Sequence, residues 1–259
     1  MNHPDTYAAL YRDELLNNII PFWLTHSKDT EHGGFLTCLT QDGSVFDTDK
    51  FVWLQGRQVW MFSLLYNQIE PKREWLDFAL HGADFLEKHG RAADGTWYFS
   101  LTREGKPLVE PYNIFSDCFA TMAFGQLYKA TGEQRYADIA YTTFQQILAR
   151  RNDPKRHWSK AVAGTRPLKN FALPMILCNL SLEIEHLLDK ATVDCLIAEC
   201  IHEVMEVFYD PKSGLILENV APDGSFVDCF EGRHLNPGHV IEAMWFIMDL
   251  GERLDDIHL

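Results

Sequence analysis

The sequence predicts an all-α protein of the α/α-toroid type, with short β-hairpins in the loops between its helices. Helical patterns run through nearly the whole chain, charge-poor helices alternate with amphipathic ones, and a hairpin sequence recurs about every 60 residues. Each interval between hairpins holds two helices. A hairpin followed by one inner and one outer helix is the unit from which such a toroid is built. The alternative is an irregular all-α domain whose turns resemble one another by accident.

Hydrophobic periodicity predicts eight helices along the chain. Gly90 and Gly132 follow two of the helical patterns as stop signals, and Pro71 and Pro237 stand near two starts. We expect an incomplete ring, because the sequence supplies only about four helix pairs and the pair that begins with the last helix is cut after that one helix. The expected ranges are 5–26, 51–69, 72–89, 115–131, 133–151, 171–188, 191–208 and 238–254.

Charge divides the central helices into two kinds. A helix that is apolar on all sides is enclosed by protein, whereas an amphipathic helix faces water on one side. The alternation of the two kinds therefore predicts an inner layer of helices enclosed by an outer layer. The nearly uncharged stretches are 51–69, 115–128 and 171–182, and the amphipathic ones are 72–89, 133–151 and 189–208.

Three segments share the pattern of a short β-hairpin. They are "GFLTCLTQDGSVFD" (34–47), "GTWYFSLTREGKPL" (95–108) and "GLILENVAPDGSFVD" (214–228). Each alternates apolar with polar residues and then turns at Asp-Gly or Glu-Gly, which is a strong short-range hairpin signal. A less regular loop, 157–168, takes the corresponding place between the second and third segments.

Composition excludes several classes of function. The formal net charge is −14, from 37 acidic and 23 basic residues, so nucleic acid and anionic membrane surfaces are not expected partners. No apolar run approaches the roughly 20 residues that span a bilayer, and no signal peptide is visible. The six cysteines are scattered without a C-x-x-C pair, which is typical of reduced thiols and predicts a cytoplasmic protein.

The first candidate site lies on one helix. Trp53, Arg57 and Trp60 are spaced by four and three residues, so they share one helical face in an otherwise uncharged stretch. Indole rings bind the apolar faces of sugars, and a guanidinium donates several hydrogen bonds in fixed directions to oxygens. This pattern predicts a sugar-binding face that points into a central cavity. The alternative is that Arg57 pairs with a buried acid from a neighbouring helix, since an unpaired buried arginine is costly.

The second candidate is the segment "NPGHVIEAMWF", 236–246. Asn236 suits the N-cap and Pro237 the first helical position, which places His239 in the first turn. A helix N-terminus disfavours imidazolium, so we expect a neutral His239 that can accept a proton, with Glu242 orienting the ring or binding a hydroxyl. The alternative makes Glu242 a partner of the helix dipole and His239 a buried polar residue.

A third carboxylate, Glu218 in "LILENV", could reach the same cavity from a hairpin strand. The alternative places it on the solvent face of that strand. His239 and Glu242 have a spacing compatible with a metal ion, but no second histidine or cysteine stands nearby in the sequence, so we expect no metal site.

Five segments together resemble the N-acylglucosamine 2-epimerase family, whose wider group includes cellobiose 2-epimerases and isomerases of mannose type. The match runs in order over nearly the whole chain. The segments are "HGGFLTCLTQDGSVFDTDKFVWLQGRQVWMFSLLY" (32–66), "IFSDCFATMAF" (114–124), "LPMILCNL" (173–180), "LENV" (217–220) and "NPGHVIEAMWF" (236–246).

The resemblance implies a single (α/α)6-toroid domain over residues 1–259 that interconverts N-acetylglucosamine and N-acetylmannosamine, a step toward sialic-acid use. Family chemistry removes the proton at the carbon next to the open-chain aldehyde and returns one on the opposite face. By resemblance, His239 is the catalytic histidine, Arg57 binds the oxyanion and hydroxyls, and Glu242 is the carboxylate beside the histidine. The resemblance further implies a homodimer with no required cofactor and with ATP as an allosteric effector.

One departure from the family pattern affects the expected activity. The family has a second catalytic histidine far downstream of "NPGH", in a "CFHVPR"-like segment that this sequence does not contain. We therefore expect a C-terminally truncated toroid. Three functions stay open: a shortened epimerase with impaired activity, a catalytically inactive sugar-binding or dimerising remnant, and a small all-α domain that serves another carbohydrate reaction.

Overall fold

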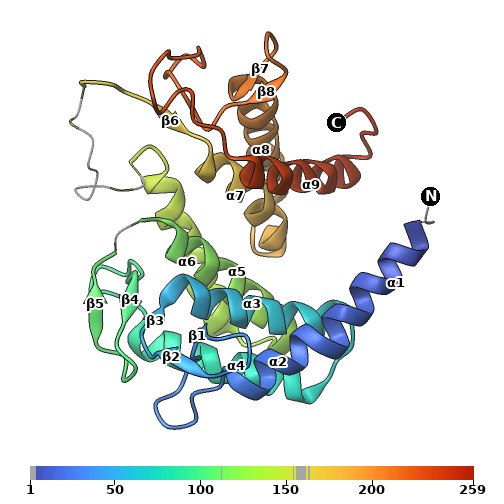
Figure 1. Ribbon diagram of the computed structural model, residues 1–259, viewed down its shortest axis with the longest axis vertical. Helices are drawn as coiled ribbons and strands as arrows, with labels where there is room; N and C mark the ends of the chain where they lie inside the picture. Colours follow the sequence, from blue (N-terminus) through green and yellow to red (C-terminus); the bar gives the residue numbers. More distant parts are fainter. Residues whose placement is uncertain (1–3, 112, 154, 156–161, 163) are drawn as a thin grey trace. The chain divides into compact units, whose positions relative to one another are not determined.

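A computed structural model describes residues 4–111, 113–153, 155, 162 and 164–259. The chain forms two compact units, Met1–Leu148 and Ala149–Leu259, which we describe separately as unit 1 and unit 2. All eight expected helical segments are present (Figure 1). The assignment of the whole chain to a single domain stays a prediction.

Unit 1 begins with one continuous helical run over the range expected for the first helix. This run consists of α1, a π-helical turn and α2. The helices that follow start and end within two residues of the predicted bounds. The helical elements are α1 (Pro4–Glu14), η1 (Leu15–Ile19), α2 (Ile20–His26), α3 (Val52–Gln68), α4 (Arg73–His89), α5 (Phe115–Thr131) and α6 (Gln134–Arg150). The strands are β1 (Cys38–Leu39), β2 (Val45–Asp47), β3 (Lys50–Phe51), β4 (Ser100–Leu101) and β5 (Pro107–Val109).

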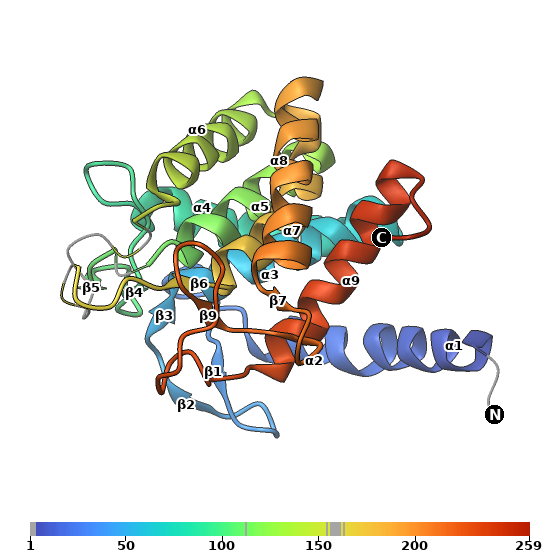
Figure 2. The same ribbon diagram turned by 90° about the horizontal axis from the view of Figure 1, so that it is seen from above.

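Among its described residues, unit 2 contains α7, α8 and α9, and the first two of these helices are followed by a turn of another helix type. Helix α7 packs against both α8 and α9, and Figure 2 shows these three helices from above. Its elements are β6 (Lys169–Asn170), α7 (Ala172–Glu183), η3 (Glu185–Leu187), α8 (Lys190–His202), η4 (Glu203–Val207), β7 (Tyr209–Asp210), β8 (Leu215–Ile216), β9 (Asn219–Val220) and α9 (Pro237–Leu254).

Burial follows the two kinds of helix in unit 1. Helix α3 packs against both α4 and α5. Every residue of α5 from Ser116 to Leu127 is buried, as expected for a helix that is apolar on all sides. Helix α4 instead buries one face, which includes Trp75, Phe78 and Phe85, and exposes most of its charged residues. The predicted division into enclosed and amphipathic helices is confirmed for these elements.

The repeated hairpin sequence forms the same turn in both units. In the first hairpin the Thr40 N–H donates to the Ser44 carbonyl at 2.8 Å, and the Gly43 N–H donates to the Thr40 carbonyl at 2.9 Å. The same two bonds recur at residues 102–106 and at 221–225, and also at 92–96, which the sequence pattern did not single out. The repeat is therefore a shared backbone structure and not an accident of composition.

Glycine is required at two of these turns for two separate reasons. Gly43 and Gly105 have φ values of 86° and 89°, a left-handed conformation that side chains disfavour. A Cβ at Gly43 would lie 2.3 Å from the ring of His26, and one at Gly105 would lie 2.4 Å from the ring of His89. In both cases a histidine at the C-terminal end of a helix, His26 of α2 or His89 of α4, packs on the glycine of the turn.

The strand pairing predicted for the third hairpin, 214–228, was wrong. Its turn forms at Gly224, but β8 pairs with β7 and β9 pairs with β6, and no described residue after the turn belongs to a strand. Beyond Ser225 the chain enters further tight turns, in which the Arg233 N–H donates to the Cys229 carbonyl, while β9 pairs with the distant β6. In the loop expected at 157–168, residues 157–161 and 163 are not among those that the structure describes.

A buried ion cluster fixes the start of α3. The Lys50 ammonium is fully buried and donates to Asp29 Oδ2 at 2.9 Å, to the Gly33 carbonyl at 2.6 Å and to the Arg103 carbonyl at 2.7 Å. Arg103 adds two hydrogen bonds to the Asp29 carboxylate, at 3.0 and 3.1 Å. Burial alone would raise the pKa of Asp29, but the hydrogen bonds from Arg103 and Lys50 outweigh it and hold this pKa well below its usual range.

Two further expectations from the sequence concern membranes and disulfides. Within the described ranges, none of the helices combines the length and the apolar character that crossing a bilayer requires. No disulfide bond joins the cysteines in the part of the chain that the structure covers.

Candidate active site

A histidine–carboxylate pair is the centre of the candidate site in unit 2. His239 Nδ1 lies 3.1 Å from Glu218 Oε1 and 3.0 Å from Glu218 Oε2. The Glu218 side chain is 8% exposed and that of His239 is 31% exposed, so the carboxylate is buried behind a ring that still reaches solvent. The alternative that Glu218 faces solvent from a hairpin strand does not hold.

The residues at the start of α9 determine where His239 lies. The Asn236 side chain accepts a hydrogen bond from the His239 N–H at 3.4 Å, and Pro237 is the first helical residue. Both predictions for this helix start are confirmed. Asparagine caps and an N-terminal proline fix where a helix begins, so the imidazole is held in the first turn.

Strand pairing places Glu218 opposite this helix start. Glu218 lies between β8 and β9, and β9 pairs antiparallel with β6, which brings Asn170 opposite Asn219. The Phe171 N–H donates to the Glu218 carbonyl at 3.0 Å. The Asn170 amide donates to Glu218 Oε1 at 3.3 Å and to Asn219 Oδ1 at 3.1 Å. The backbone of Glu218 is therefore fixed by a second segment, and its carboxylate reaches the helix.

This geometry assigns different roles to the two ring nitrogens. A carboxylate accepts hydrogen bonds only, so Nδ1 carries the proton that it donates to Glu218. In the neutral ring Nε2 then has the free lone pair and can accept a proton. A buried carboxylate that holds a histidine in one tautomer is a recurring arrangement for a general base.

The predicted cluster on α3 lies in unit 1. The Arg57 guanidinium lies over the ring of Phe119 on α5, 4.7 Å from its centroid, and the Trp53 ring is 6.0 Å from the same ring. Trp53, Arg57 and Trp60 are all half-buried. The structure thus brings Trp53 and Arg57 together on an aromatic ring of the neighbouring helix.

Two residues of these clusters were not predicted from the sequence. Phe119 is one of many apolar residues in a helix that is buried throughout, so no pattern distinguishes it. Asn170 stands directly before a charge-poor helix, where an asparagine is an ordinary capping residue, and its side chain does accept from the Ala172 N–H at 3.1 Å. Glu242 is half-buried on α9, and its roles in orienting the ring or binding a hydroxyl stay predictions.

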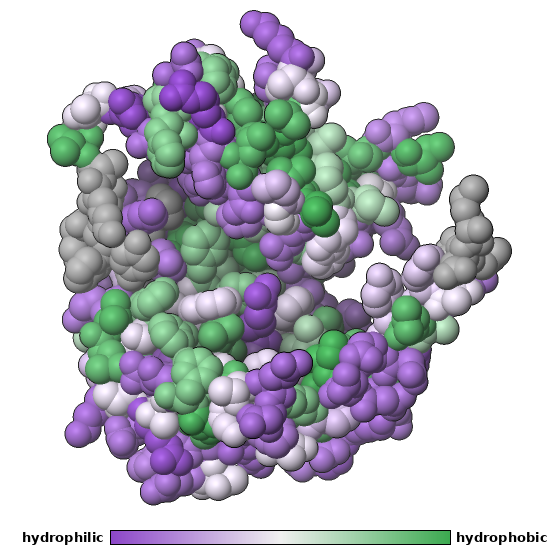
Figure 3. Space-filling view, in the orientation of Figure 1, coloured by the Kyte–Doolittle hydropathy of each residue, from purple (hydrophilic) through white to green (hydrophobic). Residues whose placement is uncertain are grey.

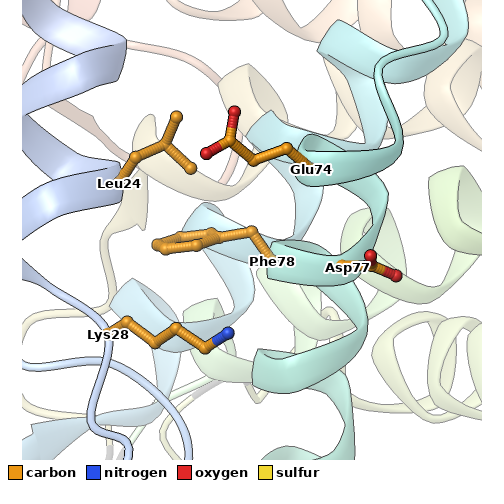
Figure 4. A pocket seen from close by; sticks show the side chains of 5 residues that line it. All are labelled: Leu24, Lys28, Glu74, Asp77 and Phe78. Atoms are coloured by element: carbon orange, nitrogen blue, oxygen red, sulfur yellow. The ribbon is translucent and has the colours of Figure 1, made fainter.

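A surface hollow of about 440 Å³ in unit 1 contains none of the predicted site residues. Figure 4 shows the ring of Phe78 between Leu24 and Glu74, which lie above it, and Lys28, which lies below it. No group of three or more histidine, cysteine or acidic side chains within the described residues is arranged to hold a metal ion.

Comparison with solved structures defines the class of fold. The chain superposes on a cellobiose 2-epimerase from Bacillus thermoamylovorans with a TM-score of 0.80 and 21% identity, over 96% of this chain and 67% of that one. It superposes on a D-mannose isomerase with a TM-score of 0.78 and 16% identity, over 97% of this chain and 68% of that one. The fold is therefore that of the (α/α)6-toroid enzymes, which confirms the predicted fold class.

Sequence comparison identifies the family. The N-acylglucosamine 2-epimerase family profile matches residues 34–258. The mouse N-acylglucosamine 2-epimerase is 40% identical over 254 residues, covering 94% of this chain and 60% of the relative. The human enzyme of that name is 38% identical over 251 residues, covering 90% of this chain and 56% of the relative. The chain belongs to the N-acylglucosamine 2-epimerase family, and it spans about three fifths of the length of the mouse relative.

Proposed function

We propose that this protein acts on the hydrogen at C2 of N-acetylglucosamine and N-acetylmannosamine and interconverts the two sugars. The observation that carries the proposal is the His239–Glu218 pair at the start of α9. Family membership supports it, because mammalian relatives at 38–41% identity are named for this reaction. The substrate is thus an amino sugar in its open-chain form.

The proposed reaction begins with proton removal at C2. His239 Nε2 accepts the C2 proton, and the electrons of the broken C–H bond form a C1–C2 double bond and place negative charge on the aldehyde oxygen, which gives an enolate. The Glu218 carboxylate stabilises the imidazolium that forms, because a charged acceptor strengthens the hydrogen bond from Nδ1. By resemblance to the family we assign Arg57 to the enolate oxygen and the hydroxyls, where a guanidinium stabilises developing negative charge.

Inversion then requires a proton donor on the opposite face of the enolate. Return of the proton from imidazolium to the same face regenerates the substrate, so with these acetamido sugars His239 alone supports only exchange at C2. The resemblance supplies a second histidine in a segment that this sequence does not contain. The second candidate function is a catalytically inactive sugar-binding remnant of the family, which would bind the sugar without exchange at C2.

Incubation with N-acetylmannosamine in heavy water separates these functions. N-acetylglucosamine that carries deuterium at C2, measured by NMR, supports the epimerase. Deuterium at C2 of recovered N-acetylmannosamine without inversion indicates one working base and contradicts full epimerisation. No exchange together with retained sugar binding supports the remnant.

The sugar-binding part of the proposal has its own test at Arg57. Arg57→Ala should weaken N-acetylmannosamine binding by at least tenfold in calorimetry, because hydrogen bonds from a charged donor are lost. Arg73→Ala is the matched control, since Arg73 is an exposed arginine that pairs with Asp77 at 2.8 Å on the outer helix α4. Equal affinity of wild type and Arg57→Ala would remove Arg57 from the site.

Three finer proposals rest on the resemblance. We propose that the product feeds sialic-acid use and that the active protein is a homodimer. We also propose that ATP acts as an allosteric effector and is not consumed. Light scattering at several protein concentrations tests the dimer, and exchange rates with and without ATP test the effector.

A further inference from the structure

The surface hollow of unit 1 lies between the end of α2 and the first half of α4. Leu24 of α2 and Lys28, which follows α2, line one side, and Glu74, Asp77 and Phe78 of α4 line the other. Its volume of about 440 Å³ falls within the range of roughly 300–1,000 Å³ that is typical of small-molecule sites. We call it the unit 1 hollow, because all five lining residues belong to that unit.

The floor of the hollow is an aromatic ring that two other rings hold in place. Phe78 is only 3% exposed. Its ring stacks on the ring of Phe35, with 4.7 Å between the centroids, and packs against the ring of Phe62 at 4.3 Å. A side chain packed in this way is fixed, so the apolar floor is already formed before a ligand binds.

Opposite charges lie on the two sides of this ring. Figure 4 shows the Glu74 carboxylate above the Phe78 ring and the Lys28 side chain below it, whereas the Asp77 carboxylate points away from the ring. Asp77 is already paired with Arg73 at 2.8 Å. Among the residues that the structure describes, neither the Lys28 ammonium nor the Glu74 carboxylate takes part in an ion pair or a hydrogen bond.

The charge of Lys28 acts on the same face of α4. Burial lowers the pKa of His81, and the positive charge of Lys28 lowers it further. His81 follows Glu74 by seven residues and Phe78 by three, so the three side chains share one face of the helix. The Lys28 ammonium is therefore close to α4 and does not extend into open solvent.

Single exposed charges are ordinary on the surface of this protein. Hydrophilic residues, purple in Figure 3, cover much of unit 1, with smaller hydrophobic patches between them. The hollow differs from that surface because two opposite charges without partners flank one apolar floor. A ligand with an anionic end at Lys28, a cationic end at Glu74 and an apolar middle on Phe78 complements all three features.

We propose that the unit 1 hollow binds a linear zwitterion, in which an unbranched apolar chain joins an ammonium to a carboxylate. The carboxylate of the ligand pairs with Lys28, its ammonium pairs with Glu74, and its chain lies on Phe78. Free ω-amino acids have this chemistry. A lysine at the C-terminus of a polypeptide shares it, through its side-chain ammonium and its terminal carboxylate. The proposal does not depend on the reaction proposed for His239.

Calorimetry of the 259-residue protein with 6-aminohexanoate tests the proposal. We expect saturable binding, and hexylamine and hexanoate should bind at least tenfold more weakly, because each lacks one of the two charged contacts. Lys28→Met and Glu74→Gln should each weaken binding of 6-aminohexanoate at least tenfold. Lys106→Met and Glu110→Gln are the matched controls, since both residues are exposed in unit 1 outside the hollow, and they should leave the affinity unchanged.

A further ligand, Nα-acetyl-lysine, distinguishes the two sources because it imitates a C-terminal lysine. Tighter binding of Nα-acetyl-lysine than of 6-aminohexanoate assigns the hollow to polypeptide ends, and the reverse order assigns it to free ω-amino acids. Equal affinity of wild type, Lys28→Met and Glu74→Gln for 6-aminohexanoate would overturn the proposal. So would the absence of saturable binding, or hexylamine or hexanoate that binds as tightly as the zwitterion.

Discussion

The buried ion cluster before α3 permits a quantitative prediction for Lys50→Met. Methionine fills a similar volume but removes the ammonium, which uses all three of its N–H donors on Asp29, Gly33 and the Arg103 carbonyl. The side chains of Lys50 and Asp29 are both 0% exposed, so water does not replace the lost partner. Breaking a buried ion pair by removing one partner typically costs 3–5 kcal/mol.

We expect the low end of that range, because Asp29 keeps its two hydrogen bonds from Arg103. The predicted loss is about 3 kcal/mol in the free energy of unfolding, a factor of about 150 in the unfolding equilibrium constant. Urea titration followed by circular dichroism measures this free energy. Lys88→Met is the control, since Lys88 pairs with Asp84 at 3.4 Å on an exposed surface and should cost less than about 0.5 kcal/mol. A loss below about 1 kcal/mol for Lys50→Met would refute the assigned role of the cluster.

Three other predictions follow from particular contacts. The pKa of Asp29 is lower in the folded protein than in the unfolded chain, so its contribution to stability is complete above about pH 4 and is lost as the pH falls through the folded pKa. Asp29→Asn should flatten this acid dependence in urea titrations, and an unchanged slope would show that other groups cause it. Gly105→Ala should lower the free energy of unfolding by about 1–3 kcal/mol more than Gly132→Ala does. A Cβ at Gly105 would lie 2.4 Å from the His89 ring, whereas nothing lies within 4 Å of a Cβ at Gly132. Equal thermal stabilities of the two variants would count against this steric argument. Glu218→Gln should slow C2 exchange by about 10²-fold or more, because an amide no longer fixes the tautomer of His239. Glu206→Gln is the control, because Glu206 contacts His202 at 2.9 Å in an exposed pair, and this variant should leave the exchange rate unchanged. Equal rates for the two variants would exclude the role of Glu218 in positioning the His239 ring.

Much of the fold was predictable because its determinants are local. The helix at 115–131 was predicted with both bounds correct, since Gly132 adopts the left-handed conformation that ends a helix. The turns at Gly43 and Gly105 follow from Asp-Gly and Glu-Gly pairs in a fixed position. The pairing of the third hairpin failed because β9 finds its partner in β6, about 50 residues earlier, and no local pattern encodes that pairing.

The individual residues of the candidate site were easier to predict from the sequence than the contacts between them. The cap at Asn236 and the place of His239 follow from one short motif. The contact between His239 and Glu218 spans 21 residues and depends on strand pairing, so the sequence favoured Glu242 as the neighbour of the ring. The position of Arg57 over Phe119 depends on how α3 packs against α5, which helix periodicity alone does not determine.

The most direct test of the proposed chemistry is the effect of His239→Gln on exchange of the C2 hydrogen of N-acetylmannosamine. Wild-type protein and the variant are incubated in heavy water, and loss of the C2 proton signal is followed by NMR. We predict exchange by the wild type and a rate at least 10²-fold lower in His239→Gln, with sugar binding retained. Exchange at the same rate in both proteins would contradict the assignment of His239 as the base.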